Sequence, residues 1–307
     1  MKKILFLMAI VVSGLMSCTD SISLGQLADT ESRLIVYAFP TEGDTVDITV
    51  SLTYPVSGRW ERLQVESVEC LTNGTADRII NRGDTSSAGF PIARYSAIGR
   101  HRCGDSIQVL VSAVGLPTAK GCTVIPERPT VESTRLDTAS YLGTSYPMVR
   151  MMMRGNASTP FYAVRMEGFY TDEYLGELWY NAPRSTFMPL KADAEPLFAG
   201  SSSTDIDLGS EDSDYYKFIY TFSNSAFTGG RATLHLYVDT GYSNIYKDFR
   251  PHLYALSNEY NSMLRSMNSL ENNDFGKYGL AFSYSTYTNV QGGYGCIVAY
   301  AESGGSE

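Results

Sequence analysis

The chain has few of the side chains that most enzymes use for catalysis. Only three of its 307 residues are histidines, and no two histidines and no two cysteines stand at the close spacing of a zinc site. The sequence also has no Gly-x-Ser-x-Gly segment, no His-Glu-x-x-His pair and no phosphate-binding glycine loop. We therefore expect a protein that is not an enzyme and holds no cofactor or metal, with an unrecognised hydrolase as a third alternative.

Positive charge is also scarce. Lysine and arginine together number 24 against 33 acidic residues, for a formal net charge of -9. Such a surface repels phosphate backbones, so nucleic-acid binding is not expected. Cysteines number five, and the spacing of Cys70, Cys103, Cys122 and Cys296 selects no pairing. We expect at most one disulfide, among the first three of these; the alternative is four small buried side chains.

No apolar run is long enough to cross a bilayer as a helix, which takes about 20 residues. The run Ile4–Val12 follows two lysines and precedes small residues and Cys18. This order predicts a secretory signal over residues 1–17. Leu15-Met16-Ser17-Cys18 resembles a bacterial lipobox, so we expect Cys18 to be diacylated and residues 18–31 to form a tether to the membrane. The alternative is an ordinary signal with an incidental cysteine.

Alternation of apolar and polar residues is the dominant pattern in the rest of the chain. It is clearest in residues 45–53 and 106–114, where every second residue is apolar, and it predicts strands with one solvated face. Turn signals such as Asn73-Gly74 separate the strands. We expect a mainly β protein: an immunoglobulin-like antiparallel sandwich over residues 32–128, then a larger antiparallel β domain over 129–307. The predicted strands are residues 34–39, 45–53, 63–71, 106–114, 121–125, 148–153, 161–170, 215–222, 233–238, 280–287 and 296–300.

One amphipathic helix is expected in the second domain, over about residues 251–271. Pro251 suits a first helical turn, and apolar residues then recur at steps of three and four from Leu253 to Leu270. We expect this apolar stripe to pack on the sheet.

Tyrosine is concentrated in the second half of the chain, where 17 of the 22 fall at or after Tyr162. Its flat ring and polar tip suit binding surfaces, so any ligand or partner is expected on the second domain. The candidate ligand-contacting or partner-contacting residues are His235, Tyr237, Tyr287, Asn289 and Tyr294. The alternative for His235 is a solvated strand face.

Three segments in order resemble one known family. They are residues 222–230 (FSNSAFTGG), the predicted helix, and residues 289–295 (NVQGGYG). Together they are similar to the Bacteroidota lipoproteins catalogued as domain of unknown function 4249. The resemblance implies an outer-membrane, lipid-anchored protein, exposed at the cell surface or facing the periplasm, that works with a TonB-dependent transporter. It supplies no catalytic residues. The glycines of 289–295 suggest a turn in which backbones approach closely.

The sequence also suggests glycosylation sites and a second functional alternative. The triplets that begin at Asp20, Asp44, Asp105 and Asp137 resemble the O-glycosylation sites of exported Bacteroidota proteins, with Ser21, Thr45, Ser106 and Thr138 as the modified residues. The second functional alternative is a structural adhesin or fimbria-type subunit, because such lipoproteins also build tandem β-sandwiches.

Overall fold

The computed structural model describes most of the chain that follows the predicted tether. It covers residues 32–53, 63–87, 90–171, 183–198, 215–241, 246–271 and 286–304. The chain divides into two compact units, and all described residues except Ser32 and Thr53 belong to the unit formed by Arg33–Leu52 and Leu63–Glu307. The predicted signal, Cys18 and Ser21 lie outside the described residues.

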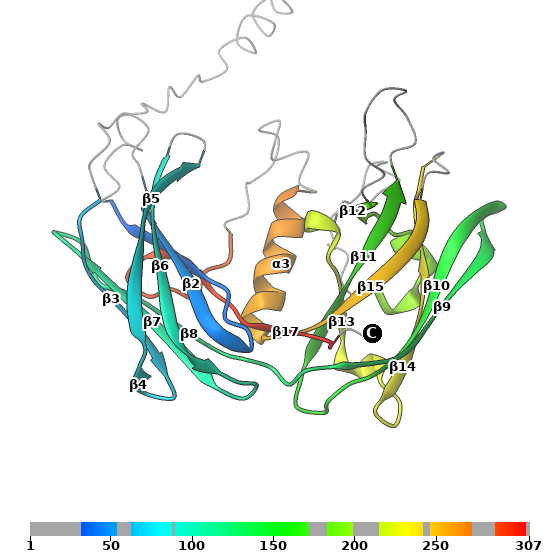
Figure 1. Ribbon diagram of the computed structural model, residues 1–307, viewed down its shortest axis with the longest axis horizontal. Coiled ribbons are helices and arrows are strands. Elements are labelled where there is room, and N and C mark those ends of the chain that lie inside the picture. Colours follow the sequence, from blue (N-terminus) through cyan, green and yellow to red (C-terminus); the bar gives the residue numbers. More distant parts are fainter. Residues whose placement is uncertain are drawn as a thin grey trace, which may run out of the picture. The chain divides into compact units, whose positions relative to one another are not determined.

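The first sheet has the strand order β16-β1-β2-β6-β5. Its strands β2, β6 and β5 are labelled in Figure 1. Val46, Ile48 and Val50 of β2 are almost fully buried and alternate with more exposed residues. This is the inward face that the period-two pattern predicts, and the strand prediction for this segment is confirmed. The bounds are β1 Leu34–Ala38, β2 Gly43–Leu52, β5 Arg78–Ser87, β6 Phe90–His101 and β16 Tyr294–Ile297.

The second sheet has the order β4-β3-β7-β8. Its third strand buries Ile107, Val109 and Val111 on one face, as the alternation predicts. The predicted turn at Asn73-Gly74 is confirmed, since both residues have positive φ, 52° and 83°. The bounds are β3 Val65–Thr72, β4 Thr75–Ala76, β7 Ser106–Ala113 and β8 Ala119–Val124.

The third and fourth sheets enclose a common hydrophobic core. Their orders are β14-β10-β9 and β12-β11-β15-β17, with β13 also paired to β11. Met151 and Leu234 from the third sheet and Val164 and Leu253 from the fourth belong to this core cluster. The bounds are β9 Thr130–Tyr141, β10 Thr144–Arg154, β11 Phe161–Thr171, β12 Pro183–Met188, β13 Tyr220–Ser223, β14 Arg231–Tyr237, β15 Tyr246–Leu256 and β17 Tyr300–Glu302.

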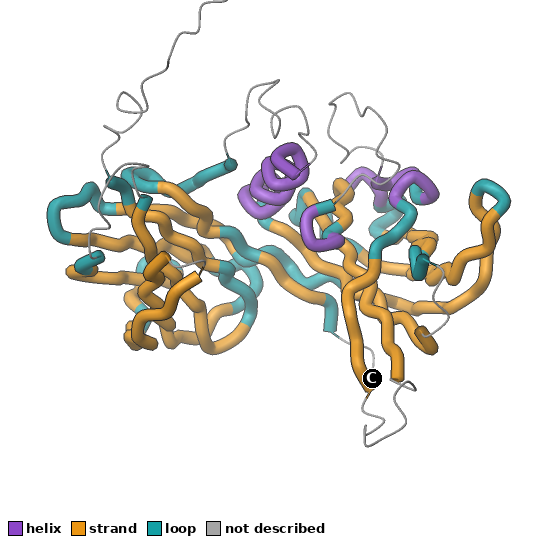
Figure 2. Tube along the Cα trace, turned by 90° about the horizontal axis from the view of Figure 1, so that it is seen from above, coloured by secondary structure: helices purple, strands orange, loops and turns teal. Residues whose placement is uncertain are grey.

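The chain is mainly β and consistent with a β-sandwich type of domain, as the sequence predicts. Figure 2 shows strands dominating over the described helical segments. Short 3-10 helices occupy η1 Ala192–Ala194, η2 Pro196–Phe198, η3 Tyr216–Phe218 and η4 Asn224–Ala226. The strand predicted over 215–222 is therefore wrong in its first half, where η3 lies. The strand predicted over 280–287 lies mostly outside the described residues.

The helix is shorter than the apolar spacing predicts. The prediction began it at Pro251, but β15 continues to Leu256 and the helix α3 covers Asn258–Glu271. Pro251 and Leu253 pair with Met166 and Val164 of β11. This pairing buries Leu253 in the core, which favours a strand over a helix for this segment. The helix begins where the Tyr260 N–H donates to the Ser257 hydroxyl at 3.2 Å, which makes Ser257 its N-cap.

The C-terminal segment belongs to two sheets in succession. β16 pairs with β1 in parallel, with Val36 opposite Gly295, and is the one parallel ladder among the described sheets. The chain then leaves that sheet, and β17 pairs with β15 in the fourth sheet. The strand predicted over 296–300 is thus two short strands. Residues from the region predicted as the second domain consequently complete the first sheet, because β1 offers them an unpaired edge.

Candidate functional site: an aromatic pocket beside an arginine

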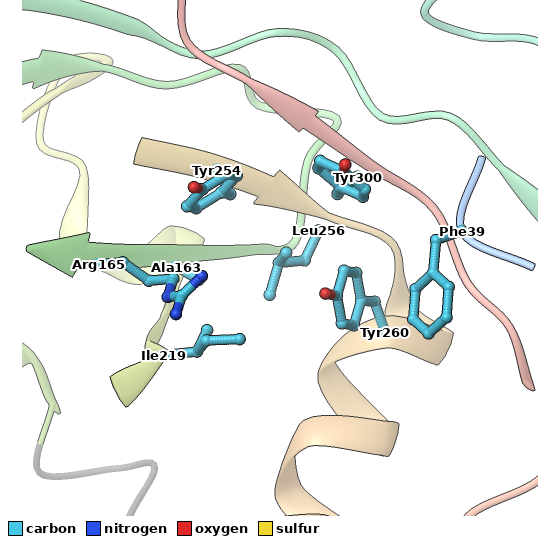
Figure 3. A pocket seen from close by; sticks show the side chains of 8 residues that line it. All are labelled: Phe39, Ala163, Arg165, Ile219, Tyr254, Leu256, Tyr260 and Tyr300. Carbon is cyan, nitrogen blue, oxygen red and sulfur yellow. The ribbon is translucent and has the colours of Figure 1, made fainter. Parts of the chain in front are cut away.

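A pocket of about 210 Å³ lies on the face of the fourth sheet that points away from the core (Figure 3). Val164 of β11 and Leu253 of β15 are buried in the core, so the alternate residues Arg165 and Tyr254 face the other way. The N-terminal turn of α3 adds a further wall. The lining residues are Phe39, Ala163, Arg165, Ile219, Tyr254, Leu256, Tyr260 and Tyr300.

The aromatic residues of the pocket form a continuous series of edge contacts. The ring of Tyr300 lies 6.0 Å from the rings of both Tyr254 and Tyr260, edge-on in each case. Tyr260 makes a similar contact with Phe39, which stacks on Tyr37 at 6.5 Å. Phe39 and Tyr37 are 42% and 39% exposed, so the aromatic surface continues from the pocket to solvent. We call this series, from Tyr37 to Tyr254, the aromatic row.

Arg165 supplies positive charge at the end of the pocket opposite Tyr260 (Figure 3). Its guanidinium carbon lies 3.3 Å from the centre of the Phe187 ring, a stacking contact that fixes the orientation of the side chain. Its Nε atom is buried without a hydrogen-bond partner, and no ion pair to Arg165 exists among the described residues. Burial lowers the pKa of Arg165, although the nearby hydroxyls of Tyr254 and Tyr260 oppose that shift.

The acidic residues next to Arg165 are engaged by a histidine instead. His252 lies directly across from Arg165 in the β11–β15 ladder. Its Nε2 is 2.9 Å from a Glu167 oxygen and its Nδ1 is 2.7 Å from a Glu302 oxygen. Both carboxylates therefore have a partner on His252, and the guanidinium of Arg165 keeps its hydrogen-bonding capacity for the pocket.

The tyrosine hydroxyls of the pocket remain protonated at neutral pH. Burial is the main cause that raises the pKa of Tyr254, Tyr260 and Tyr300, in the case of Tyr260 to about 12. None of the three hydroxyls has a hydrogen-bond partner within the described part of the chain. The pocket thus offers aromatic faces, free hydroxyl groups and one cation, which suits binding; it contains no side chain activated as a nucleophile.

A second acid–histidine pair lies elsewhere and is structural. His101 Nε2 is 3.1 Å from Asp77, and the two side chains are 0% and 8% exposed. Cys70 adjoins them, but burial and the Asp77 charge raise the pKa of its thiol to about 12, so it is not a reactive thiolate. Across the described ranges, no group of three or more acidic, histidine or cysteine side chains is placed to hold a metal ion.

The predicted ligand-contacting residues are not gathered at the pocket. His235 and Tyr237 lie on the more exposed face of β14, where the Tyr237 ring is 5.8 Å from that of Tyr141. Tyr287 packs against the cluster beneath α3, and Tyr294 is 53% exposed on β16. These residues therefore belong to three different parts of the fold, and none of the five lines the pocket.

Asn289 has a clear structural task. Its Nδ2 donates to the Ile297 carbonyl at 2.8 Å and to the Cys122 carbonyl at 3.1 Å. Its Oδ1 accepts the Ile297 N–H at 2.9 Å. One side-chain amide thus joins β16 to the end of β8.

The described positions predicted for glycosylation are accessible to solvent, and the described cysteines are not bonded to one another. Thr45, Ser106 and Thr138 are exposed, as a modified hydroxyl must be. Each of the four described cysteines is free, so none of them forms a disulfide in this structure, within the predicted limit of at most one. The alternative of four buried thiols holds for Cys70 and Cys296 but not for Cys122, which is exposed. Within the described segments, no helix has the length and apolarity that a membrane span requires.

A model of one protein family, described as "Domain of unknown function (DUF4249)", matches residues 21–305. The chain belongs to this family. The resemblance inferred from the sequence is therefore confirmed at the level of the family. No curated protein matches this member of the DUF4249 family.

One solved structure with a recorded similarity is the adhesin InvE of Yersinia pseudotuberculosis. It is 13% identical, with a TM-score of 0.22, and the match covers 74% of this chain and 55% of that one. The chain thus spans about half the length of that structure. At this TM-score the likeness carries no information on the fold or the function of the DUF4249 chain.

The glycines of the family segment 289–295 allow the backbone contacts that the sequence predicts. A Cβ atom on Gly292 would lie 2.2 Å from the Thr118 carbonyl oxygen, and one on Gly295 would lie 2.1 Å from that of Val36. Both residues also have positive φ, 77° and 100°. The segment approaches Thr118, the residue before β8, and Val36 of β1, so in this DUF4249 chain its glycines serve packing between two sheets.

The aromatic row combines residues that sequence reasoning did not connect. The abundance of tyrosine after Tyr162 pointed to this half of the chain, and Tyr254, Tyr260 and Tyr300 belong to it. Nothing in the sequence pattern pointed to Phe39 or Arg165 as binding residues. Phe39 follows a strand of the first sheet, and Arg165 occupies an ordinary polar position in β11. The two residues line one pocket only because the tertiary structure brings together segments that are far apart in the sequence.

Proposed function

We propose that this protein is a non-enzymatic, lipid-anchored protein of the outer membrane that binds a small ligand and assists a TonB-dependent transporter. The observation that carries the binding role is the pocket, whose aromatic row ends beside an arginine with no ion-pair partner among the described residues. Evolved pockets of this composition hold ligands through ring contacts and a few polar groups. The anchor and the membrane location are inferred from the signal and Cys18 in the sequence.

A binding role is supported over catalysis by the chemistry of the lining residues. The raised pKa of each tyrosine keeps it a neutral donor and not a general base. His252, the nearest histidine in the ladder, is hydrogen-bonded at both ring nitrogens by carboxylates. We therefore assign the pocket to binding, and the hydrolase alternative finds no support in it.

The alternative role, a structural adhesin or fimbria-type subunit, is less well supported by the strand pairing. Such subunits accept a strand from another copy at an open sheet edge. Here β16 of the same chain pairs with β1, so β1 is not available as an acceptor. The proposal rests on the pocket and not on a sheet edge, and it remains with the accessory binding protein.

The test is a mild-detergent pull-down of the tagged, lipidated protein from its native outer membrane, followed by mass spectrometry of the retained proteins. We expect stoichiometric recovery of one transporter barrel. The matched control is Cys18→Ala, which should leave the protein in the soluble fraction without a barrel, because a diacyl anchor is what holds it at the membrane. Recovery of the lipidated protein alone, or of its own polymers, would overturn the accessory role.

A further inference from the structure

The pocket contains a positive charge that no described residue neutralises. Arg165 has no ion-pair partner within the described ranges, and the carboxylates of Glu302 and Glu167 are held by His252 at 2.7 and 2.9 Å. A partly buried cation without a counter-ion is unfavourable, and in binding sites it is commonly matched by a charged group of the ligand. The chain carries a formal net charge of -9, so this local cation is not part of a general basic surface.

The geometry of Arg165 favours a carboxylate in particular. Stacking on Phe187 at 3.3 Å fixes the plane of the guanidinium, and the planar fork of an arginine matches the two oxygens of a carboxylate. The Tyr260 hydroxyl points toward the middle of the pocket, facing the side where Arg165 lies (Figure 3). A carboxylate next to Arg165 could therefore also accept a hydrogen bond from a neutral tyrosine.

The remaining surface and the size of the pocket describe the rest of the ligand. The edge-to-face rings of Tyr254, Tyr260 and Tyr300 present flat surfaces on which a ring can lie. The cavity of about 210 Å³ is smaller than the roughly 300–1,000 Å³ typical of drug-sized ligand sites. Its volume therefore suits one ring-sized group rather than an extended molecule.

We propose that this pocket binds a small organic anion in which one ring, aromatic or sugar, carries a carboxylate. The carboxylate pairs with Arg165 and the ring lies against the tyrosines of the aromatic row. This assignment rests on the binding role proposed above and names the class of ligand. It does not depend on the transporter.

The experiment is calorimetric titration of the purified full chain in detergent with matched pairs of probes. Benzoate and benzamide differ in charge on the same aromatic ring, and glucuronate and glucose differ similarly on a sugar ring. We expect at least one anion to bind about 10-fold or more tightly than its neutral counterpart, as a charge-assisted hydrogen bond predicts. The pair that shows the difference identifies the kind of ring.

Substitutions link the selectivity to the pocket. Arg165→Gln should weaken binding of the preferred anion about 10-fold or more and leave its neutral counterpart unchanged. Arg150→Gln is the matched control, because Arg150 is exposed on β10, away from the pocket, and it should behave as wild type. If the glutamine variant fails to fold, by its near-ultraviolet circular dichroism, Arg165→Lys replaces it and should weaken the anion several-fold by losing the planar fork.

Two outcomes would overturn the proposed ligand class. One is equal binding of each anion and its neutral counterpart, including no measurable binding of any of the four at 10 mM (roughly the weak limit of specific recognition). The other is a folded Arg165 variant with unchanged affinity for the anion. If Arg165-dependent binding is found but the pull-down recovers no barrel, the ligand class stands and the accessory role fails.

Discussion

At the scale of single residues, the strongest constraint lies in the family segment near the C-terminus. Gly295 combines a φ of 100° with a Cβ position 2.1 Å from the Val36 carbonyl oxygen. Either feature disfavours a side chain, and the two causes can be separated, because Gly143 has a similar φ of 82° with open space around its Cβ position. The sequence signalled that glycine was needed in this segment, but only the fold shows which carbonyl it approaches.

Replacing Gly295 with alanine should lower the free energy of unfolding by about 2–5 kcal/mol, the sum of left-handed strain and a backbone clash. Gly143→Ala should lower it by about 1–2 kcal/mol, from strain alone. Urea denaturation followed by tyrosine fluorescence measures both. An equal decrease in the free energy of unfolding in the two variants would show that the contact with Val36 is not made.

Asn289 illustrates how residue type alone misleads. Its place in a recognisable, glycine-rich segment suggested a ligand contact. In the structure its amide is used by the Ile297 backbone, at 2.8 and 2.9 Å, and by the Cys122 carbonyl. An asparagine that bridges backbone groups and one that binds a ligand look the same in a sequence, because the difference is which groups surround the amide.

At the scale of secondary structure, the start of α3 shows a conflict between two periodicities. The apolar spacing continues from Leu253 to Leu270, which favoured one long helix. The segment up to Leu256 pairs with β11 instead, and Ser257 then supplies the cap. The same hydroxyl accepts the Ala299 N–H at 3.3 Å, so Ser257 also connects the helix to the segment between β16 and β17.

Replacing Ser257 with alanine should lower the free energy of unfolding by about 1–3 kcal/mol. The loss combines a helix cap with a buried N–H left without its acceptor. The control is Ser262→Ala within α3, whose hydroxyl bonds, among the described residues, only to the Asn258 carbonyl one turn earlier. That variant should stay within about 0.5 kcal/mol of wild type. A Ser257 variant as stable as the control, by urea denaturation, would contradict the capping role.

At the scale of the whole molecule, the carboxylates of Asp239 and Glu167 are stabilised in their charged form. Burial raises the pKa of Asp239, but the Lys191 ammonium at 2.6 Å and the Gly241 N–H outweigh it, so the pKa lies below its usual value. Burial also raises the pKa of Glu167, but hydrogen bonds from Ser185 and His252 outweigh the effect of burial, so this pKa is lowered as well. Such groups favour the folded state while they are ionised.

Because the folded pKa of these groups lies below the unfolded one, their contribution is present above about pH 5 and is lost as pH falls through the folded value. We expect the urea concentration at the unfolding midpoint to decrease as the pH is lowered from 7 to 3. Asp239→Asn should lower the midpoint at pH 7 and flatten this dependence. A wild-type midpoint that is constant over the range would contradict the pairing.

The local features of this protein follow from its amino-acid sequence alone. The alternating residues in β2 and β7 and the turn at Asn73-Gly74 depend on neighbours in the chain, so their pattern predicts their structure. The tertiary structure decided the rest: the end of β15, the pairing of β16 with β1, and the meeting of Phe39 with Arg165 in one pocket. Those contacts join residues far apart in the sequence, where burial of apolar area overrides local preference.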